Sequence, residues 1–153
     1  CLVGDGSMQL NIQELETIMH HNLQVKIFLF NNSGYLSIRG TQEGFLDRNY
    51  VGSSEKGGMS LPDFKKIAQA YGYPIFQIQN NGELTKGIQS TLETSGPTFC
   101  EILMPSDQEI IPTQGFKENS DGTFSPAPLE DMKPFLDREV FNELMEIEPI
   151  GEK

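Results

Sequence analysis

Two short polar motifs have the residue types of a site for a phosphate and a hard metal ion. They are Gly4-Asp5-Gly6-Ser7 and Asn31-Asn32-Ser33-Gly34. Glycines let backbone N–H groups approach an anion, and the start of a helix adds a favourable dipole for phosphate. Carboxylate, amide and carbonyl oxygens suit Mg²⁺ or Ca²⁺, with water and phosphate oxygens as further ligands. The residues predict a magnesium-diphosphate site, although either motif taken singly is also an ordinary turn.

The hydrophobic pattern places each motif directly after a buried strand. Cys1–Val3 is apolar and leads into the first motif, and Val25–Phe30 is β-branched and aromatic and leads into the second. The ends of neighbouring parallel strands meet at one edge of a sheet. We therefore expect the side chains of Asp5 and Asn32 to lie close together.

The rest of the chain alternates between helical and strand patterns. Apolar residues recur every three or four positions from Met8 to His21, which predicts one amphipathic helix with Ser7 as its N-cap. Tyr35–Gly58 is glycine-rich and predicts a functional loop with a short helix. The remaining expected elements are a helix capped by Ser60 and ended by Gly72, strands over 74–78 and 97–104, and a helix over 83–93. This order predicts an α/β fold, a parallel sheet flanked by helices on both faces.

The pattern changes after residue 104. We expect residues 1–104 to form the α/β domain. Residues 105–153 are expected to form a proline-rich extended segment and short acidic helices that pack on the same domain, ending in an irregular acidic tail. Because the chain opens in the middle of an apolar strand without a methionine, we expect a piece of a longer enzyme, cut at its N-terminal side.

Charge and composition exclude several classes of partner. The chain has 153 residues, with 11 basic against 22 acidic side chains. Such an excess argues against nucleic acid or an anionic membrane surface as a partner. No apolar run is long enough to span a bilayer, and the start is not that of a signal peptide. Cys1 and Cys100 lack metal-ligand spacing and are interpreted as incidental or buried thiols of a reducing compartment, which predicts a cytoplasmic protein.

Taken together, the two motifs resemble the thiamine-diphosphate signature of enzymes that process 2-oxoacids. The similarity runs through 4–10, 13–15 and 25–35, and more loosely through 64–72 and 96–104. Over about two-thirds of its length the chain resembles the C-terminal, diphosphate-binding domain of the acetolactate synthase and pyruvate decarboxylase superfamily. The resemblance implies thiamine diphosphate and Mg as cofactors. It also implies a reaction that makes or breaks a carbon–carbon bond next to the carbonyl of a small 2-oxoacid substrate.

The resemblance also implies roles for individual residues. Asp5, Asn32 and the main-chain carbonyl of Gly34 would hold Mg²⁺. The other implied positions are Gly6 and Ser7 at the diphosphate, Gly4 at the turn, and Tyr35 and Leu36 near the thiazolium or the substrate pocket. No catalytic residue is assigned within the chain, since the activating glutamate of this family belongs to the pyrimidine-binding domain of a second subunit. We expect the chain alone to be catalytically silent and to assemble as a homodimer or tetramer.

Some alternatives stay open. Ile38 stands where several decarboxylases of the family have an acidic residue, and Tyr35-Leu36-Ser37 where acetolactate synthases have Gly-Met-Val. These departures argue against simple pyruvate decarboxylation and leave a carboligase or lyase open. Arg39 and Arg48 are interpreted as exposed loop residues rather than as partners of a substrate carboxylate. A non-catalytic interaction or regulatory module with the same fold is the alternative, and it would bind no cofactor.

Overall fold

The computed structural model describes residues 1–146, and for residues 117 and 118 the backbone alone. The chain divides into two compact units, Cys1–Gln108 and the part from Glu109 onward. The predicted packing of the segment after residue 104 on the α/β domain stays a prediction. Within the described part, no helix combines the length and the apolar character needed to cross a membrane.

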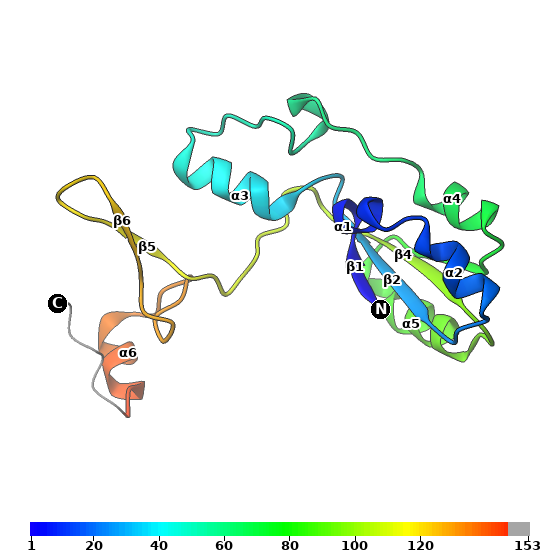
Figure 1. Ribbon diagram of the computed structural model, residues 1–153. Helices are drawn as coiled ribbons and strands as arrows, with labels where there is room; N and C mark the ends of the chain where they lie inside the picture. Colours follow the sequence, from blue (N-terminus) through cyan, green and yellow to red (C-terminus); the bar gives the residue numbers. More distant parts are fainter. Residues whose placement is uncertain (147–153) are drawn as a thin grey trace. The chain divides into compact units, whose positions relative to one another are not determined.

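The first unit is built on a parallel sheet of four strands (Figure 1). These are β1 (Leu2–Gly4), β2 (Lys26–Asn31), β3 (Ile75–Ile78) and β4 (Thr98–Leu103), in the spatial order β1-β2-β4-β3. Gly4 of β1 pairs with Phe30 of β2, so the carboxyl ends of these two strands lie side by side. On the other side of β2, Phe28 pairs with Cys100 of β4. β-branched and aromatic residues form these strands because they suit a sheet buried on both faces.

Helices cover both faces of the sheet. One core layer is made by α1 (Asp5–Leu10), α2 (Glu14–His20) and α4 (Phe64–Ala70), which pack Met8, Leu15, Phe64 and Ala68 against Leu29 and Phe99. On the other face, Leu84 of α5 (Leu84–Glu93) packs against a smaller cluster of Phe28, Ile78 and Cys100. The predicted fold class is therefore confirmed.

The predicted single helix from Met8 to His21 is wrong. Two short helices replace it, because α1 ends at Leu10 and a turn precedes Glu14. The helix also begins at Asp5, with Gly4 rather than Ser7 at the N-cap. A carboxylate in the first turn accepts from a backbone N–H group that has no partner in the helix, which explains the earlier start.

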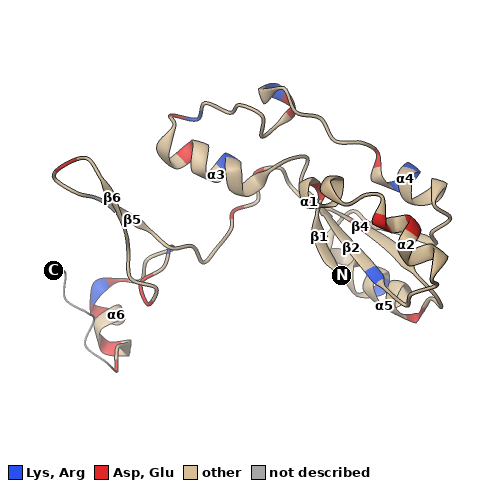
Figure 2. Ribbon diagram, in the orientation of Figure 1, with Lys and Arg blue, Asp and Glu red and all other residues tan. Residues whose placement is uncertain are grey.

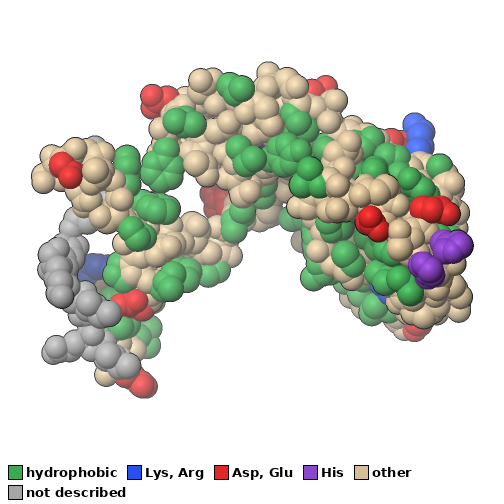
Figure 3. Space-filling view, viewed as in Figure 1, with side chains coloured by type: hydrophobic (Ala, Val, Ile, Leu, Met, Phe, Trp, Pro, Cys, Tyr) green, Lys and Arg blue, Asp and Glu red, His purple; other side chains and the backbone are tan. Residues whose placement is uncertain are grey.

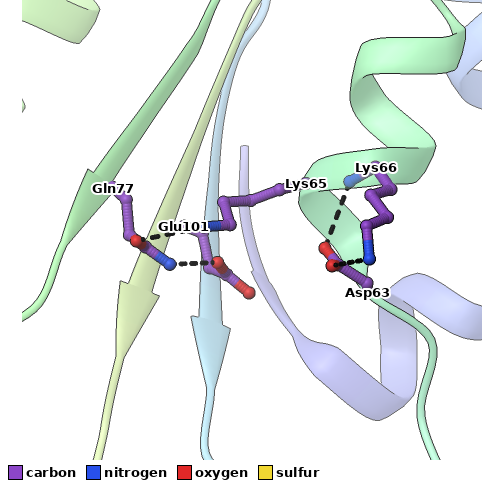
Figure 4. Close-up of polar contacts among 5 residues, drawn as sticks. All are labelled: Asp63, Lys65, Lys66, Gln77 and Glu101. Atoms are coloured by element: carbon purple, nitrogen blue, oxygen red, sulfur yellow. Dashed lines mark hydrogen bonds and ion pairs between the residues drawn. The ribbon is translucent and has the colours of Figure 1, made fainter.

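The second predicted helix also begins later than expected. Asp63, and not Ser60, is the N-cap, and its carboxylate accepts from the backbone N–H of Lys66 at 3.2 Å (Figure 4). Aspartate caps a helix as well as serine does. Gly72 follows the end of this helix with a φ of +83°, as its predicted role requires.

The expected loop over 35–58 contains a full helix, α3 (Leu36–Phe45), and a short 3-10 turn, η1 (Glu55–Gly57). A second 3-10 turn, η2 (Asn81–Glu83), precedes α5. Gly40 and Gly44 lie within α3. Because glycine disfavours a helix interior, a prediction from helix propensity misses this helix.

The second unit has more structure than the sequence indicates. An antiparallel hairpin of β5 (Phe116–Glu118) and β6 (Phe124–Pro126) lies where an extended segment is predicted. One of the expected short helices is present as α6 (Arg138–Leu144). Its Arg138 donates to Asp131 at 2.7 Å and lies over the ring of Phe141. The predicted acidic tail falls largely on residues 147–153, outside the described residues.

Charged and reactive side chains outside the two motifs lie in ordinary surroundings, and the cysteines fit their interpretation as incidental or buried thiols. Acidic residues are spread over the elements of both units (Figure 2). His20 and His21 lie exposed at the surface (Figure 3). Cys1 is exposed and Cys100 buried, and both are free thiols. Burial raises the pKa of Cys100 above that of an ordinary thiol.

The buried Tyr73 predicts a stability loss at high pH. Its hydroxyl donates to the carbonyl of Leu15 at 2.9 Å, and burial, with the charge of Glu16, raises its pKa from 10 to about 12. Between these values the unfolded phenol loses its proton while the buried one keeps it, so the native state binds more protons. We expect the free energy of unfolding to fall as pH rises from 10 to 12, by at most about 1.4 kcal/mol per pH unit.

Urea unfolding of the native chain and of Tyr73→Phe across this range measures the effect. The variant loses the titrating group and should show a smaller slope. Equal slopes in the two proteins would contradict the prediction.

Candidate functional site

The carboxyl edge of the sheet brings the two motifs together. Asp5 follows the end of β1, and Asn32 and Gly34 follow the end of the neighbouring β2. The Asp5 side chain is 2 % exposed, and its Oδ2 accepts from the backbone N–H of Asn32 at 3.1 Å and of Gly34 at 3.0 Å. The β-α-β connection therefore brings the Asp5 side chain against the backbone of Asn32 and Gly34, while the expected closeness of the Asp5 and Asn32 side chains stays a prediction.

The carboxylate of Asp5 holds the turn in place. Its Oδ1 also accepts from the N–H of Gly6 at 2.6 Å, so three backbone donors converge on one side chain. A carboxylate offers about four acceptor positions. At least one position is therefore left for a further partner such as a cation.

The side-chain oxygen of Asn32 has no hydrogen-bond partner. Asn32 Oδ1 is buried among the residues that the structure describes, and no donor reaches it. Buried polar atoms without a partner are rare in native proteins, and each calls for an explanation. A cation beside the Asp5 carboxylate would satisfy this oxygen. The donor set fits Mg²⁺, which prefers oxygen ligands.

No competing metal centre of the usual kind is found within residues 1–146, because no group of three histidine, cysteine, aspartate or glutamate side chains lies close enough together there. A cation at the strand edge would thus be held by one carboxylate together with amide and carbonyl oxygens.

Gly34 is the residue that the geometry of the turn requires. Its φ is +148°, and a Cβ there would overlap the Arg39 guanidinium and lie 2.6 Å from the carbonyl oxygen of Ser53. Only glycine fits such a backbone in so crowded a place. The preceding Ser33 is also left-handed, with φ of +59°.

The remaining predicted site residues lie around this turn. Gly4 is the extended N-cap of α1, and Gly6 packs so closely under the ring of Tyr35 that a Cβ would overlap it. Ser7 is exposed in the first turn of α1. Tyr35 and Leu36 are half-buried at the start of α3. All eight predicted residues thus lie at or beside this edge, and their contacts with a cofactor stay a prediction.

Arg39 is a structural residue of the site that sequence reasoning missed. Its guanidinium donates to the carbonyl oxygens of Asn32 at 3.3 Å, Ser53 at 3.1 Å and Ser106 at 2.6 Å. It is half-buried, so the interpretation as an exposed loop arginine is wrong. No sequence signal marks it, because its three partners come from distant segments. Arg48 is exposed as expected and pairs with Glu43.

Removing the Arg39 contacts is expected to loosen the turn. Arg39→Met should lower the free energy of local opening around residues 32–53 by about 1–3 kcal/mol, since a charged donor to three carbonyls is lost. Hydrogen exchange at the N–H of Tyr35, which donates to Ser53, measures this opening. The control Arg48→Met removes only an exposed ion pair and should change it by less than about 0.5 kcal/mol. Similar exchange in both variants would refute the role of Arg39.

Comparisons with known proteins show which family the chain resembles. Residues 1–102 match the family model described as thiamine pyrophosphate enzyme, C-terminal TPP binding domain. Acetolactate synthase large subunit of Cyanidium caldarium is 32% identical over 112 residues, covering 73% of the chain and 19% of that protein. Acetolactate synthase 1, chloroplastic, of Zea mays is 33% identical over 113 residues, covering 71% of the chain and 18% of that protein. The chain spans about a fifth of the length of these curated relatives.

Proposed function

The chain belongs to the thiamine pyrophosphate enzyme family, with residues 1–102 as its C-terminal TPP-binding domain, and from this premise we propose that it holds the magnesium-diphosphate end of the cofactor. Thiamine pyrophosphate and thiamine diphosphate are the same compound. The intact enzyme that we propose makes or breaks a carbon–carbon bond next to the carbonyl of a 2-oxoacid. The names of the relatives, acetolactate synthases, support this substrate class.

The observation that carries the proposal is that the turn bound by the buried Asp5 carboxylate also carries a buried amide oxygen without a partner. Asp5 and Asn32 come from neighbouring strand ends, and Asn32 Oδ1 is the atom without a partner. A magnesium ion bound to a diphosphate would give this oxygen a partner and could also take the acceptor position that is left on Asp5.

We assign Asp5, the side-chain oxygen of Asn32 and the carbonyl of Gly34 as magnesium ligands. Gly6 and Ser7 lie beside these ligands, where they would contact the diphosphate. When bound, thiamine diphosphate supplies an electron sink for the bond that breaks next to the carbonyl. The magnesium ligands and the diphosphate contacts would orient the cofactor. Tyr35 and Leu36 would shield its thiazolium ring from water. The departures at Ile38 and at Tyr35-Leu36-Ser37 leave the particular 2-oxoacid reaction open.

We further propose that a pyrimidine-binding domain of a second subunit completes the site, within a homodimer or tetramer. Large apolar side chains at the surface support an assembly that buries them, since Leu2 is 74% and Leu10 73% exposed (Figure 3). The chain by itself would then be catalytically incomplete. Its cytoplasmic location stays a prediction, as some relatives are chloroplastic forms.

A calorimetric titration of thiamine diphosphate into the 153-residue chain, with and without Mg²⁺, tests the proposal. We expect binding only with Mg²⁺, tightened when a pyrimidine-binding domain of the same family is supplied. Absence of binding at millimolar cofactor, even with that domain present, would refute the cofactor site and favour a non-catalytic module.

A further inference from the structure

We propose that Glu101 is a positioning residue, which fixes the turn Asn31–Gly34 in the conformation that presents the magnesium ligands. The link to magnesium rests on the proposed function. The link to the turn rests on the contacts of Glu101 alone.

Glu101 is a carboxylate in the middle of the sheet. It lies on β4, is 4 % exposed, and stands in register between Leu29 of β2 and Gln77 of β3. Phe99, two residues earlier on the same face of the strand, belongs to the apolar core. Packing alone would favour another apolar residue at 101, because a buried carboxylate is unfavourable unless it is hydrogen-bonded.

Both carboxylate oxygens of Glu101 accept a hydrogen bond from a side-chain amide. Oε1 accepts from Nδ2 of Asn31 at 2.8 Å, and Oε2 accepts from Nε2 of Gln77 at 2.7 Å. Nδ2 of Asn31 is the donor in its contact with Glu101. The NH₂ group of Asn31 must therefore face Glu101, and its oxygen must face the other way.

The orientation of the Asn31 side chain also affects the turn that carries the proposed magnesium ligands. Asn31 Oδ1 accepts from the backbone N–H of Ser33 at 3.1 Å, and so holds Ser33 in its left-handed conformation. Ser33 lies between Asn32 and Gly34, two of the proposed magnesium ligands. A chain of two hydrogen bonds thus connects the buried carboxylate to both of these ligands.

The second partner of Glu101, Gln77, is hydrogen-bonded to residues outside the turn. Gln77 Oε1 accepts from Lys65 of α4 at 3.2 Å and from Gln79 at 3.1 Å, and Figure 4 shows Lys65, Gln77 and Glu101 in this network. Lys65 is the charged group that faces the network from α4. A change at Gln77 therefore breaks one hydrogen bond of Glu101 without touching Asn31.

This asymmetry gives a matched pair of variants. Glu101→Met and Gln77→Met both replace a polar side chain by methionine and both break the Glu101–Gln77 hydrogen bond. Only Glu101→Met also releases Asn31. In the full chain without cofactor, we expect hydrogen exchange at the N–H groups of Ser33 and Gly34 to speed up about tenfold or more in Glu101→Met, and to stay near the native rate in Gln77→Met.

The affinity for Mg²⁺ at saturating thiamine diphosphate is the second readout. Loss of a group that orients metal ligands weakens binding about 10–100-fold, and we expect this in Glu101→Met only. Should Glu101→Met not fold, Asn31→Leu serves instead, because a leucine of similar size neither donates to Glu101 nor accepts from Ser33. It should likewise speed exchange at Ser33.

The outcomes separate the two proposals. Equal exchange at Ser33 and Gly34 in the two methionine variants, or native exchange in Asn31→Leu, would overturn the positioning role. Faster exchange in Glu101→Met would uphold the positioning of the turn even if the native chain bound no magnesium cofactor with a pyrimidine-binding domain present, a result that would refute the proposed function alone.

Discussion

Replacing Asp5 by alanine is expected to abolish magnesium-dependent binding of thiamine diphosphate and to lower the free energy of unfolding by about 3–5 kcal/mol. The N–H groups of Gly6, Asn32 and Gly34 lose their common acceptor, and unpaired buried donors are costly. A direct ligand should matter more than an orienting one, so the affinity should fall more than about 100-fold. Calorimetry measures the binding, and urea denaturation the stability.

The control for Asp5→Ala is Glu93→Ala, which removes an exposed carboxylate at the end of α5. Surface substitutions of this kind change stability by less than about 0.5 kcal/mol. Native affinity should remain in this control. An Asp5→Ala chain that stays folded and binds the magnesium cofactor as tightly as the native chain would refute the assignment of Asp5 as a ligand.

Phe99→Ala is expected to lower the free energy of unfolding by about 3–5 kcal/mol, because it deletes a fully buried ring and leaves a cavity in the core. Phe99 lies on β4 between the two neighbouring strands, and its ring meets that of Tyr73 edge to face at 6.3 Å. Domains of this size are stable by about 5–15 kcal/mol, so the substitution removes a large share of the free energy of unfolding.

Thermal and urea unfolding measure the effect of Phe99→Ala. Leu129→Ala is the matched control, since it shortens a side chain that is 65% exposed. It should cost less than about 0.5 kcal/mol. A loss below about 1 kcal/mol in Phe99→Ala would contradict the position of this ring at the centre of the core.

The sheet and the meeting of the two motifs could be predicted from sequence. Runs such as Val25–Phe30 are buried on both faces, so β-branched and aromatic residues mark them without ambiguity. Once β1 and β2 are parallel neighbours, chain connectivity alone puts Asp5 next to Asn32. Local chemistry decides the helix boundaries instead, as the starts at Asp5 and Asp63 show.

Other features depend on contacts between distant parts of the chain. The glycine-rich α3 is held by Gln42, whose side chain donates to the carbonyl of Val51 and accepts from the hydroxyl of Ser53. Likewise, the role of Glu101 cannot be predicted from the sequence, because it depends on hydrogen bonds to the side-chain amides of Asn31 and Gln77. Tertiary hydrogen bonds of this kind leave no periodic trace in the sequence.

The unpartnered oxygen of Asn32 implies a conflict between stability and function. An unsatisfied buried acceptor lowers the stability of the cofactor-free protein by about 1–3 kcal/mol, and an apolar residue of similar shape would avoid that loss. A bound cation that gives this oxygen a partner would remove the loss. The domain would then reach its full stability only in the loaded state, and cofactor supply would control how much folded protein persists in the cell.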